Sequence, residues 1–353
     1  MMLNIGALTD VVHSHYATMV LSEHGDPGLH ALRKLLGFIK DVYGFIDPET
    51  YVGQLIIFKA LDESQEILPR SAATQLSAMK DISQFAVGDC TVETLDGGQI
   101  LVWSATSLNI KQIASKAIAY TYKQRVESFH AGTKSSQVDK IVIGCASNFA
   151  IPTFDDLKEA LEHYRSEMIR HSSCPIFATV WYDGNRLFFK SKQEKTMRNS
   201  LLHYLKSRLR GNVEVRPEQI VDSTHPVDIK VTWFLSNRMA LIEIKWLGKS
   251  RNSSKITSEY SQVRALSGAK QLVDYLDKNK VQAPIHKTRG YLVVIDGRRA
   301  KLTKKSKQLD IAAGMKFATL EITYNPKHHE SRDDFEIPIR MFAEPLCQAS
   351  ASC

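Results

Sequence analysis

Hydrophobic positions in the first 190 residues alternate between helical and strand-like spacing. A helical period is set by Leu29, Leu32, Leu35, Leu36 and Ile39, and an apolar run at residues 51–58 predicts a strand after it. The turn Asp96-Gly97-Gly98 joins two short apolar segments and predicts a hairpin. We expect strands at about 92–95, 99–104, 140–144 and 176–182, and helices at about 109–129 and 154–170. This order predicts a mixed α/β domain.

The second half of the chain has a clearer order of elements. A helix is predicted at about 192–210, with the Gly211-Asn212 pair as its C-terminal stop. Strands follow at about 213–220, 227–234 and 239–247. A polar loop at 248–257, a helix at about 258–278 and an apolar strand at 291–295 complete it. The predicted order is therefore helix, three strands, helix, strand.

A domain boundary is expected near residue 185. The turn Asp183-Gly184-Asn185 precedes a charged stretch, and loop residues of this kind mark domain junctions. We therefore expect a domain of residues 1–185 and a second of residues 186–353, both in the mixed α/β (α+β) class with a mixed central sheet in the second.

Charge divides unevenly between the two halves. Residues 1–190 hold 17 Lys and Arg against 21 Asp and Glu, which gives −4, whereas residues 191–353 hold 29 against 17, which gives +12. A basic domain attracts polyanions because each phosphate that it neutralises releases counterions. The second half thus favours a nucleic-acid partner, although a soluble basic domain of another kind has the same charge.

Several other functional classes lack support in the sequence. No apolar stretch is long enough for a bilayer, and the first 20 residues carry His13, His15 and Asp10 where a signal peptide carries Lys or Arg, so we expect a cytoplasmic protein without membrane contact. The five cysteines are scattered without a CxxC pair, so neither disulfides nor a zinc site is expected. No glycine-rich phosphate loop is present.

Charged residues interrupt two of the apolar strands of the second half. Asp228 lies between Val227 and Ile229, while Glu243 and Lys245 alternate with apolar residues in the next strand. A short turn joins the strands, so the two acids should be near cross-strand neighbours on one side of the sheet. Paired carboxylates with a nearby amine fit Mg²⁺ or Mn²⁺, and the amine can orient or help deprotonate an attacking water.

The spacing of an acid and a lysine is weak on its own. The triplet Asp156-Leu157-Lys158 has the same spacing, but it falls in the first turn of an amphipathic helix, where an acid favours the helix dipole. Charge inside an apolar strand is costly unless it is used, which distinguishes the pair on the strand from the pair on the helix.

These residues resemble the signature of the PD-(D/E)XK nuclease superfamily, which has the restriction-endonuclease-like fold. Pro226-Val227-Asp228 and Glu243-Ile244-Lys245 are similar to its two segments, with one residue inserted between Pro and Asp. The resemblance covers residues 190–300. It implies a nuclease in which Asp228, Glu243 and the Ile244 carbonyl hold the metal and Lys245 assists.

The resemblance also implies supporting residues on the two helices. Glu194 lies where the family often places a further acid, with an ordinary surface glutamate as the alternative. The segment from Gln271 to Tyr275 is similar to the Gln-x-x-x-Tyr element of the RecB-like branch, and both residues fall on one helical face. An ordinary amphipathic helix would give the same pattern.

Basic residues flank this predicted core on both sides. They are suited to phosphate contacts that carry no sequence information, or to a solvated surface alone. The candidates for nucleic-acid binding are Lys249, Arg251 and Lys255 in the first segment and Arg298, Arg299, Lys301, Lys304, Lys305 and Lys307 in the second.

The sequence therefore predicts a metal-dependent nuclease acting on DNA, with RNA left open. The acidic first domain is expected to control it through a homo-oligomer, a protein partner or a small ligand, as in a prokaryotic anti-phage effector, a role given by analogy alone. Two alternatives stay open: a non-catalytic nucleic-acid-binding protein with the same fold, and a sequence-specific restriction endonuclease.

Overall fold

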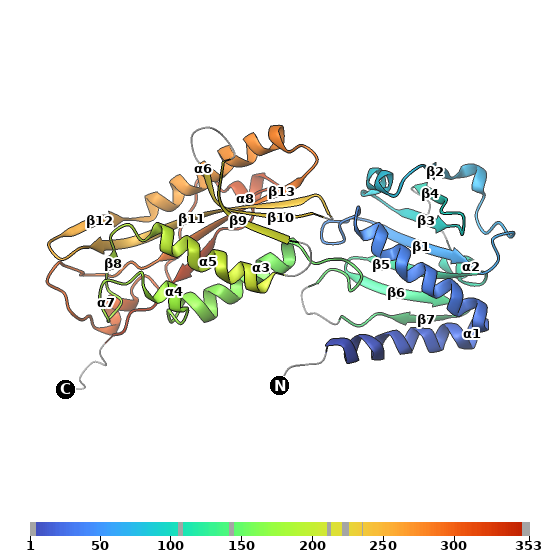
Figure 1. Ribbon diagram of the computed structural model, residues 1–353, viewed down its shortest axis with the longest axis horizontal. Coiled ribbons are helices and arrows are strands. Elements are labelled where there is room, and N and C mark those ends of the chain that lie inside the picture. Colours follow the sequence, from blue (N-terminus) through green and yellow to red (C-terminus); the bar gives the residue numbers. More distant parts are fainter. Residues whose placement is uncertain are drawn as a thin grey trace. The chain divides into compact units, whose positions relative to one another are not determined.

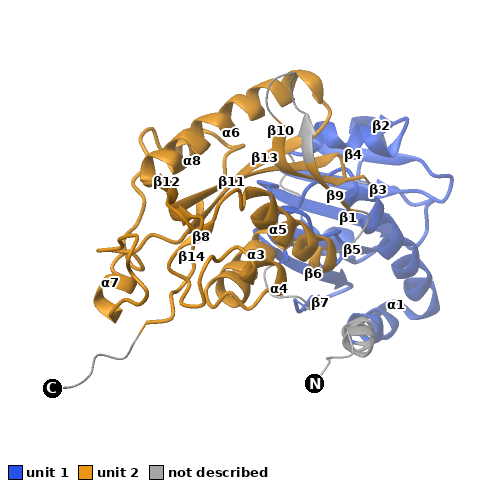
Figure 2. Cartoon of the chain, turned by 60° about the vertical axis from the view of Figure 1, so that its left-hand side comes forward, with its two compact units in different colours: residues 1–155 blue, residues 156–353 orange. Residues whose placement is uncertain are grey.

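The structure of the 353-residue chain is a computed structural model that describes residues 5–104, 109–140, 145–209, 213–220, 226–234 and 236–347. It forms two compact units, Met1–Asp155 and Asp156–Cys353 (Figure 2). Each unit is built on a mixed β-sheet, so the predicted mixed α/β class is confirmed. The charge imbalance follows these units, since the first holds 12 basic and 16 acidic residues (−4) and the second 34 and 22 (+12).

The boundary lies at Asp155, earlier than the expected position near residue 185. Three helical segments before residue 185 belong to the second unit, α3 (Phe154–His163), the π-helical turn η3 (Tyr164–Ile169) and α4 (Pro175–Ala178). The Tyr164 hydroxyl, for example, donates to Ser200 Oγ at 2.7 Å. An amphipathic helix does not reveal from its own sequence which core its apolar face will join, so the loop at 183–185 was mistaken for the boundary.

The first unit has a seven-stranded sheet covered by a long bent helix, α1 (Ile5–Tyr43), which bends at Gly25, where φ is 62°. The strand order is β2-β4-β3-β1-β5-β6-β7, with only β1 and β3 parallel among these neighbours. The elements are β1 (Gln54–Ala60), η1 (Arg70–Ala72), β2 (Thr74–Leu76), η2 (Met79–Phe85), β3 (Cys90–Thr94), β4 (Ile100–Ser104), α2 (Ile110–Ala114), β5 (Ala117–Lys123), β6 (Val126–Ala131) and β7 (Lys134–Gln137). The predicted hairpin at 92–104 is confirmed as β3 and β4.

The helix expected at 109–129 is wrong. The chain forms the short helix α2 and then a hairpin of β5 and β6, which turns at Gln124 and Arg125 with positive φ angles of 49° and 67°. β5 is buried on both sides, by the α1 side of the core and by a second apolar cluster on the other side. Such a strand lacks the alternation of apolar and polar residues from which strands are recognised.

The second unit has a central sheet in the order β14-β13-β11-β10-β9, with β12 and β8 pairing to the far part of β11. β13 is parallel to both β11 and β14, while β9, β10 and β11 form an antiparallel meander. The elements are β8 (Phe189–Lys190), α5 (Glu194–Arg208), β9 (Val213–Ile220), β10 (Pro226–Trp233), β11 (Arg238–Arg251), β12 (Ile256–Tyr260), α6 (Gln262–Gln282), β13 (Lys287–Asp296), α7 (Ile311–Met315), α8 (His328–Ser331) and β14 (Ile339–Phe342).

Helices α5 and α6 lie on opposite sides of this sheet (Figure 1). α6 buries Ala265, Ala269 and Leu272 against the side of the sheet that carries Leu241 and Leu292. β10 alternates as predicted, because Val227, Ile229, Val231 and Trp233 are buried while Asp228, Lys230 and Thr232 are partly exposed. The predicted order of helix, three strands, helix and strand is therefore present, with β12 added.

Two further predictions about this unit are wrong. The polar loop at 248–257 is a hairpin, because β11 continues to Arg251 and pairs with β12, and α6 begins at Gln262 after the N-cap residue Ser261. The strand at 176–182 is the short helix α4 and a turn, with Pro175 at the first helical position. Most of the strand expected at 140–144 and the Gly211-Asn212 stop lie outside the described residues.

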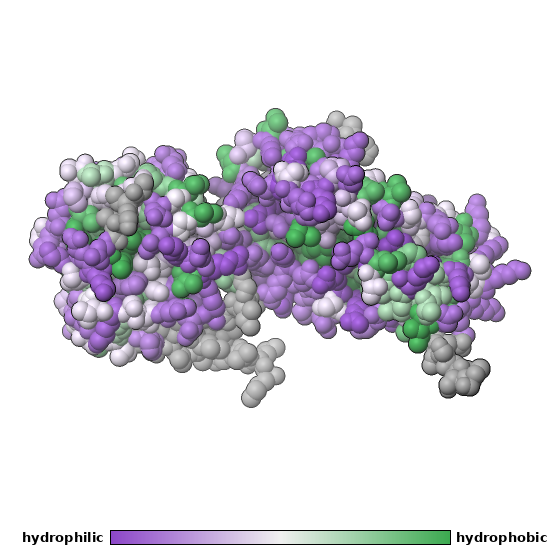
Figure 3. Space-filling model, turned by 180° about the vertical axis from the view of Figure 1, so that it is seen from behind, coloured by the Kyte–Doolittle hydropathy of each residue, from purple (hydrophilic) through white to green (hydrophobic). Residues whose placement is uncertain are grey.

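The helices and the surface of the chain bear on contact with a membrane. Among the described residues, no helix has both the length and the apolar character that crossing a membrane requires. On the side shown in Figure 3, hydrophilic residues predominate and hydrophobic ones are interspersed among them. Scattered apolar residues are ordinary on a folded protein and indicate no particular partner.

Candidate active site

The predicted carboxylates lie where the antiparallel ladder between β10 and β11 opens. Ile229 of β10 pairs with Ile242 of β11, so one further step of the same register places Asp228 opposite Glu243. Beyond this point β11 has no strand partner on that side until Gly248 pairs with Tyr260 of β12, among the described residues. The backbone N–H of Ile244 donates instead to Asp228 Oδ2 at 2.8 Å. The sequence predicts the same neighbourhood of the two acids on one side of the sheet.

Glu243 is a buried acid with incomplete hydrogen bonding. The residue is 2% exposed, and its Oε2 atom has no hydrogen-bond partner among the residues that the structure describes. Burial, and then the charge of Asp228, raise the pKa of Glu243 to about 7, although Lys245 and Arg264 act in the opposite direction. Burial likewise raises the pKa of Asp228, against the Ile244 N–H, Lys245 and Arg198. The pKa of each acid is thus raised even though Lys245 pairs with Glu243 and Arg198 with Asp228.

Lys245 is fixed by a chain of hydrogen bonds that reaches from β11 to α6. Its Nζ donates to Glu243 Oε1 and, at 2.9 Å, to Gln271 Oε1. The Gln271 amide donates to the Tyr275 hydroxyl, which donates to the Pro226 carbonyl at 3.2 Å. Gln271 and Tyr275, which were predicted from the sequence to support the site, therefore contact it through Lys245 and the start of β10.

Gly268 on α6 leaves the space that the Lys245 side chain occupies. A Cβ atom at position 268 would lie 2.6 Å from Cγ of Lys245 and 3.1 Å from a methyl group of Leu292. Carbon atoms do not approach so closely without a shift of one of them. The absence of a side chain at this position thus lets α6 pack directly over the lysine.

Glu194 lies beside this cluster but has other partners. Its Oε1 accepts from Trp246 Nε1 at 3.1 Å and from a terminal guanidinium nitrogen of Arg264 at 3.3 Å, and half of its side chain is exposed. The described contacts do not link it to Asp228 or Glu243. The structure thus brings Glu194 to the edge of the site as an anchor for Trp246 and Arg264.

Two arginines near the site were not predicted as site residues. A terminal guanidinium nitrogen of Arg198 lies 3.6 Å from Asp228 Oδ1, and Arg264 stacks on Tyr260 with 3.9 Å between its guanidinium carbon and the ring centroid. The spacing of these arginines from predicted residues indicates that they lie near the site. Arg198 follows Glu194 by four residues and Arg264 precedes Gln271 by seven, so each shares a helical face with a residue that was predicted.

The basic residues predicted to bind nucleic acid fall into two groups. Arg298 forms an ion pair with the buried Asp296, and Arg299 is 6% exposed and donates to the carbonyls of Ala343 and Arg186. These two hold the fold together internally, so their prediction as surface phosphate contacts is wrong.

The other candidates lie nearer the solvent. Arg251 donates to the Lys304 carbonyl and stacks on Tyr182, and Lys249 forms an ion pair with Glu259 at 3.2 Å. The exposed lysines are Lys255 at the β11–β12 turn and Lys301, Lys304, Lys305 and Lys307 in the loop after β13.

The chemistry of the site fits a hard divalent cation. Within the described parts of the chain no group of three or more His, Cys, Asp or Glu side chains is placed to hold a metal ion. Mg²⁺, however, is commonly bound by one or two carboxylates, with water and substrate phosphate completing its six ligands. The unpartnered Oε2 of Glu243 and the neighbouring Asp228 supply oxygen ligands of that kind.

Comparison with known proteins adds no relative. No family model matches the chain, and neither a curated protein nor a solved structure matches it. Its function must therefore be argued from the site.

Proposed function

We propose that the second unit is a metal-dependent nuclease of the PD-(D/E)XK superfamily, with a restriction-endonuclease-like core and DNA as its substrate. The observation that carries the proposal is the opposition of Asp228 and Glu243 where the strands separate, with Lys245 beside them. The order α5, β9, β10, β11, α6, β13 supports it, as does the charge of +12 on this unit.

Each residue of the proposed site would have its own role in the reaction. Asp228 and Glu243 would hold Mg²⁺ or Mn²⁺, with the Ile244 carbonyl as the further ligand expected from the family. The cation, when bound, supplies Lewis-acid polarisation of the scissile phosphate. Nζ of Lys245 orients the attacking water and takes part in moving its proton, while Gln271 and Tyr275 keep the amine in place.

Electrostatics give a physical reason for this arrangement. A buried acid beside a second, partly exposed acid raises the free energy of the folded chain, and a divalent cation between them would remove their repulsion. A site of this kind binds the cation because the protein alone does not satisfy it. Lys245 pairs with Glu243 Oε1 and Arg198 with Asp228 Oδ1, which leaves Glu243 Oε2 as a ligand atom without a partner in the described residues.

We propose that the first unit controls the nuclease activity of the second unit. Its net charge of −4 does not favour nucleic acid, so a second subunit, a protein partner or a small ligand is the proposed contact. An anti-phage effector would likewise combine a controlling domain with a nuclease domain. Sedimentation of the full chain tests the subunit form of this proposal, and a mass near 39.8 kDa at working concentration would refute that form.

A panel of substrates tests the proposed activity. Purified full-length protein is incubated with supercoiled DNA, linear DNA and RNA, each with Mg²⁺, Mn²⁺ or EDTA. We expect cutting of DNA in either metal and none in EDTA. Cutting of RNA alone would replace DNA as the substrate, and discrete fragments of linear DNA would favour the sequence-specific restriction endonuclease.

The same panel separates the enzyme from a binding protein. A non-catalytic nucleic-acid-binding protein would retain DNA in every buffer and cut it in none, with no difference between wild type and the Glu243→Ala and Lys245→Ala variants. Retention without cutting would therefore overturn the proposed activity.

A further inference from the structure

A basic cavity lies further along the strand that carries Glu243 and Lys245. It has a volume of about 630 Å³ and is lined by the end of β11, the loop after β13 and α7 with the residues that follow it. Lys249, Lys301 and Lys316 are its exposed or partly exposed cations. Cavities of this volume hold small organic ligands, including a nucleotide.

Charge in this cavity is strongly one-sided. Four basic side chains line it against one acid, Glu259, which forms an ion pair with Lys249 and is 64% exposed. The side chains of Lys301 and Lys316 form no hydrogen bond or ion pair within the described residues. Two lysines without an internal partner beside a cavity make a site for an anion.

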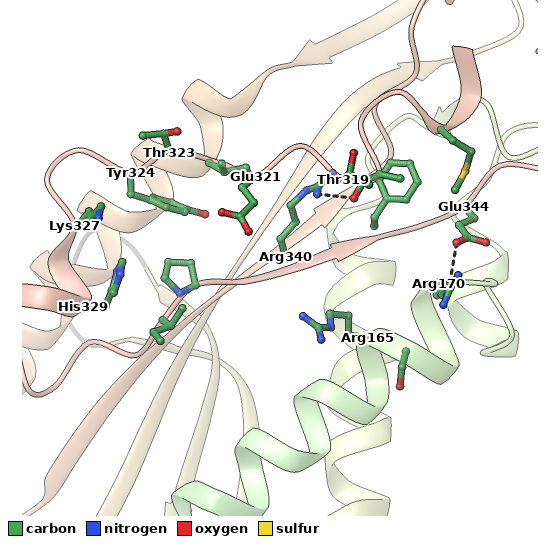
Figure 4. A pocket seen from close by; sticks show the side chains of 17 residues that line it. Arg165, Arg170, Thr319, Glu321, Thr323, Tyr324, Lys327, His329, Arg340 and Glu344 are labelled. Carbon is green, nitrogen blue, oxygen red and sulfur yellow. Dashed lines mark hydrogen bonds and ion pairs between the residues drawn. The ribbon is translucent and has the colours of Figure 1, made fainter. Parts of the chain in front are cut away.

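A second cavity of about 1000 Å³, beside β14, shows the opposite case (Figure 4). Its basic side chains are already paired: Arg170 with Glu344, Arg340 with Asp296, and Lys327 with Glu330. Arg165 is paired with Glu162. The arginines and lysine of that cavity are held by acids, whereas Lys301 and Lys316 of the β11 cavity remain available to a ligand within the described part of the chain.

The β11 cavity also has a firm apolar wall. Leu302 and Ala313 are 5% exposed, and the Phe317 ring is backed by the Arg298 guanidinium, whose carbon lies 4.7 Å from the ring centroid. Arg298 is itself held by the buried Asp296. An aromatic ring fixed in this way can stack with a nucleobase.

Arg299 places a further positive charge beneath the cavity. Its terminal nitrogens donate to backbone carbonyls, but its Nε atom has no partner within the described residues. Burial lowers the pKa of Arg299 to about 10, so the guanidinium keeps its charge at neutral pH. This fixed charge adds to the field of the two lysines.

The position of the cavity relates it to the proposed catalytic residues. Lys249 follows Lys245 by four residues in the same strand, which at about 3.3 Å per residue separates their Cα atoms by roughly 13 Å. At about 3.4 Å for each nucleotide of a stacked strand, that distance corresponds to roughly four nucleotides.

We propose that this cavity holds one nucleotide unit of the substrate strand, a few nucleotides from the scissile bond. Its phosphate lies on Lys301 and Lys316, and its base lies against Phe317. The inference rests on the proposed nuclease function, because it takes the ligand to be part of the strand that is cut. A free nucleotide has the same chemistry and is the alternative source of that ligand.

The test measures binding without cleavage. Fluorescence anisotropy follows a labelled single strand and its duplex in EDTA across a series of salt concentrations. We expect the Lys301→Gln/Lys316→Gln variant to lower the slope of log K against log salt by about 0.9 for each lost phosphate contact on a duplex. The Lys304→Gln/Lys305→Gln variant has the same change in net charge and lies outside the cavity lining, so its slope should change less.

Base stacking gives a second, independent measurement. The Phe317→Ala variant should lose at least about fivefold in affinity for the single strand. The Phe317→Leu variant, which keeps more of the side-chain volume, serves if the alanine variant does not fold. Equal losses from the two lysine pairs, or unchanged affinity in both Phe317 variants, would overturn the proposal.

Two further arms identify the source of the ligand and separate this inference from the proposed activity. Competition by free mononucleotides at concentrations comparable to the oligonucleotide would assign the cavity to a free nucleotide and overturn the substrate-strand assignment. Cutting is scored separately with wild type. If wild type cuts DNA but the Lys301→Gln/Lys316→Gln variant binds it as tightly as wild type, the role of the cavity is refuted and the nuclease activity stands. If binding depends on the cavity residues but wild type does not cut, the nuclease activity is refuted and the binding role of the cavity stands.

Discussion

Each unit buries a glutamate in its sheet, but the two residues differ in how fully their carboxylate oxygens are hydrogen-bonded. Glu127 of the first unit is fully buried and accepts from the Tyr120 hydroxyl at 2.6 Å, Lys140 Nζ at 2.9 Å and the backbone N–H of Asn148 at 3.1 Å. Ser147 donates to it as well. Glu243 of the second unit has a second acid beside it and one oxygen that finds no partner in the part of the chain that the structure describes.

This difference separates a structural acid from a candidate functional one. Buried polar groups in folded proteins almost always have hydrogen-bond partners, and the donors around Glu127 follow that rule. A buried acid that is left incomplete raises the free energy of the folded chain, so its retention calls for a ligand. Removing each acid should therefore have opposite consequences for stability and activity.

The largest expected effect concerns the amine beside Glu243. Lys245→Ala should reduce the rate of DNA cutting by about 10²- to 10⁴-fold, the usual contribution of a positioned proton-transfer group. The matched control is Lys158→Ala, because Asp156-Leu157-Lys158 has the same spacing and Lys158 is exposed on α3. Rates are measured from plasmid nicking in Mg²⁺. An equal loss in both variants would remove the distinction between the strand pair and the helix pair.

The second effect concerns the structural acid. Glu127→Ala removes the acceptor for several buried donors and leaves Lys140 without its partner, so unfolding should require about 3–5 kcal/mol less free energy. Urea denaturation measures it. A loss below about 1 kcal/mol would mean that the network around Glu127 does not stabilise the first unit as described.

The third effect is a pH dependence of stability in metal-free buffer. Because the pKa of Glu243 is raised to about 7 from its ordinary value of 4.5, the folded chain holds a proton that the unfolded chain releases between these values. The contribution of Glu243 to stability should therefore be complete below about pH 4.5 and be lost as pH rises to 7, by on the order of 3 kcal/mol.

The Glu243→Gln variant serves as the control for this pH effect. It has no carboxyl group to titrate at this position, so it should lack that loss and be more stable than wild type at pH 8 without metal. Denaturation curves across this pH range compare the two proteins, and parallel curves would show that Glu243 does not carry the uncompensated charge.

The fourth effect is stabilisation by metal without substrate. Mn²⁺ or Mg²⁺ at about 100 times its dissociation constant should stabilise wild type by about 2.7 kcal/mol, because the unfolded chain lacks the site. Thermal melting at pH 8 measures the shift. Glu127 variants that still fold should keep it and Glu243→Gln should lose it, and an equal shift in Glu243→Gln would place the cation elsewhere.

The smallest effect concerns the space over Lys245. Gly268→Ala places a methyl group against Cγ of Lys245 and should lower the cutting rate, because the amine must move. Stability should change by less than about 1 kcal/mol, since the gain in helix propensity offsets part of the crowding. Ala269 is the adjacent buried position of α6, and Ala269→Gly serves as the control with the reverse change in propensity. Undiminished cutting by Gly268→Ala would show that Lys245 tolerates displacement.

The sequence was most informative where charge interrupted an apolar strand. Asp228 and Glu243 could be placed opposite each other because the short connection between β10 and β11 constrains the register. β5 could not be recognised because both of its sides are buried and its periodicity is lost. The partner of Arg299 is equally invisible in sequence, since the Ala343 carbonyl meets it only through the folded sheet. Asp296 lies two residues before Arg298, but its burial also depends on the fold. Local pattern thus predicts elements and register, and tertiary packing decides which charges are free.

The most direct measurement is the rate at which supercoiled DNA is nicked by wild type and by Glu243→Gln, each in Mg²⁺ and in EDTA. If Asp228 and Glu243 hold the cation that drives the cleavage, wild type cuts in Mg²⁺ alone and the variant, although folded, cuts in neither buffer. Cutting by Glu243→Gln at the wild-type rate, or by wild type in EDTA, would contradict that account.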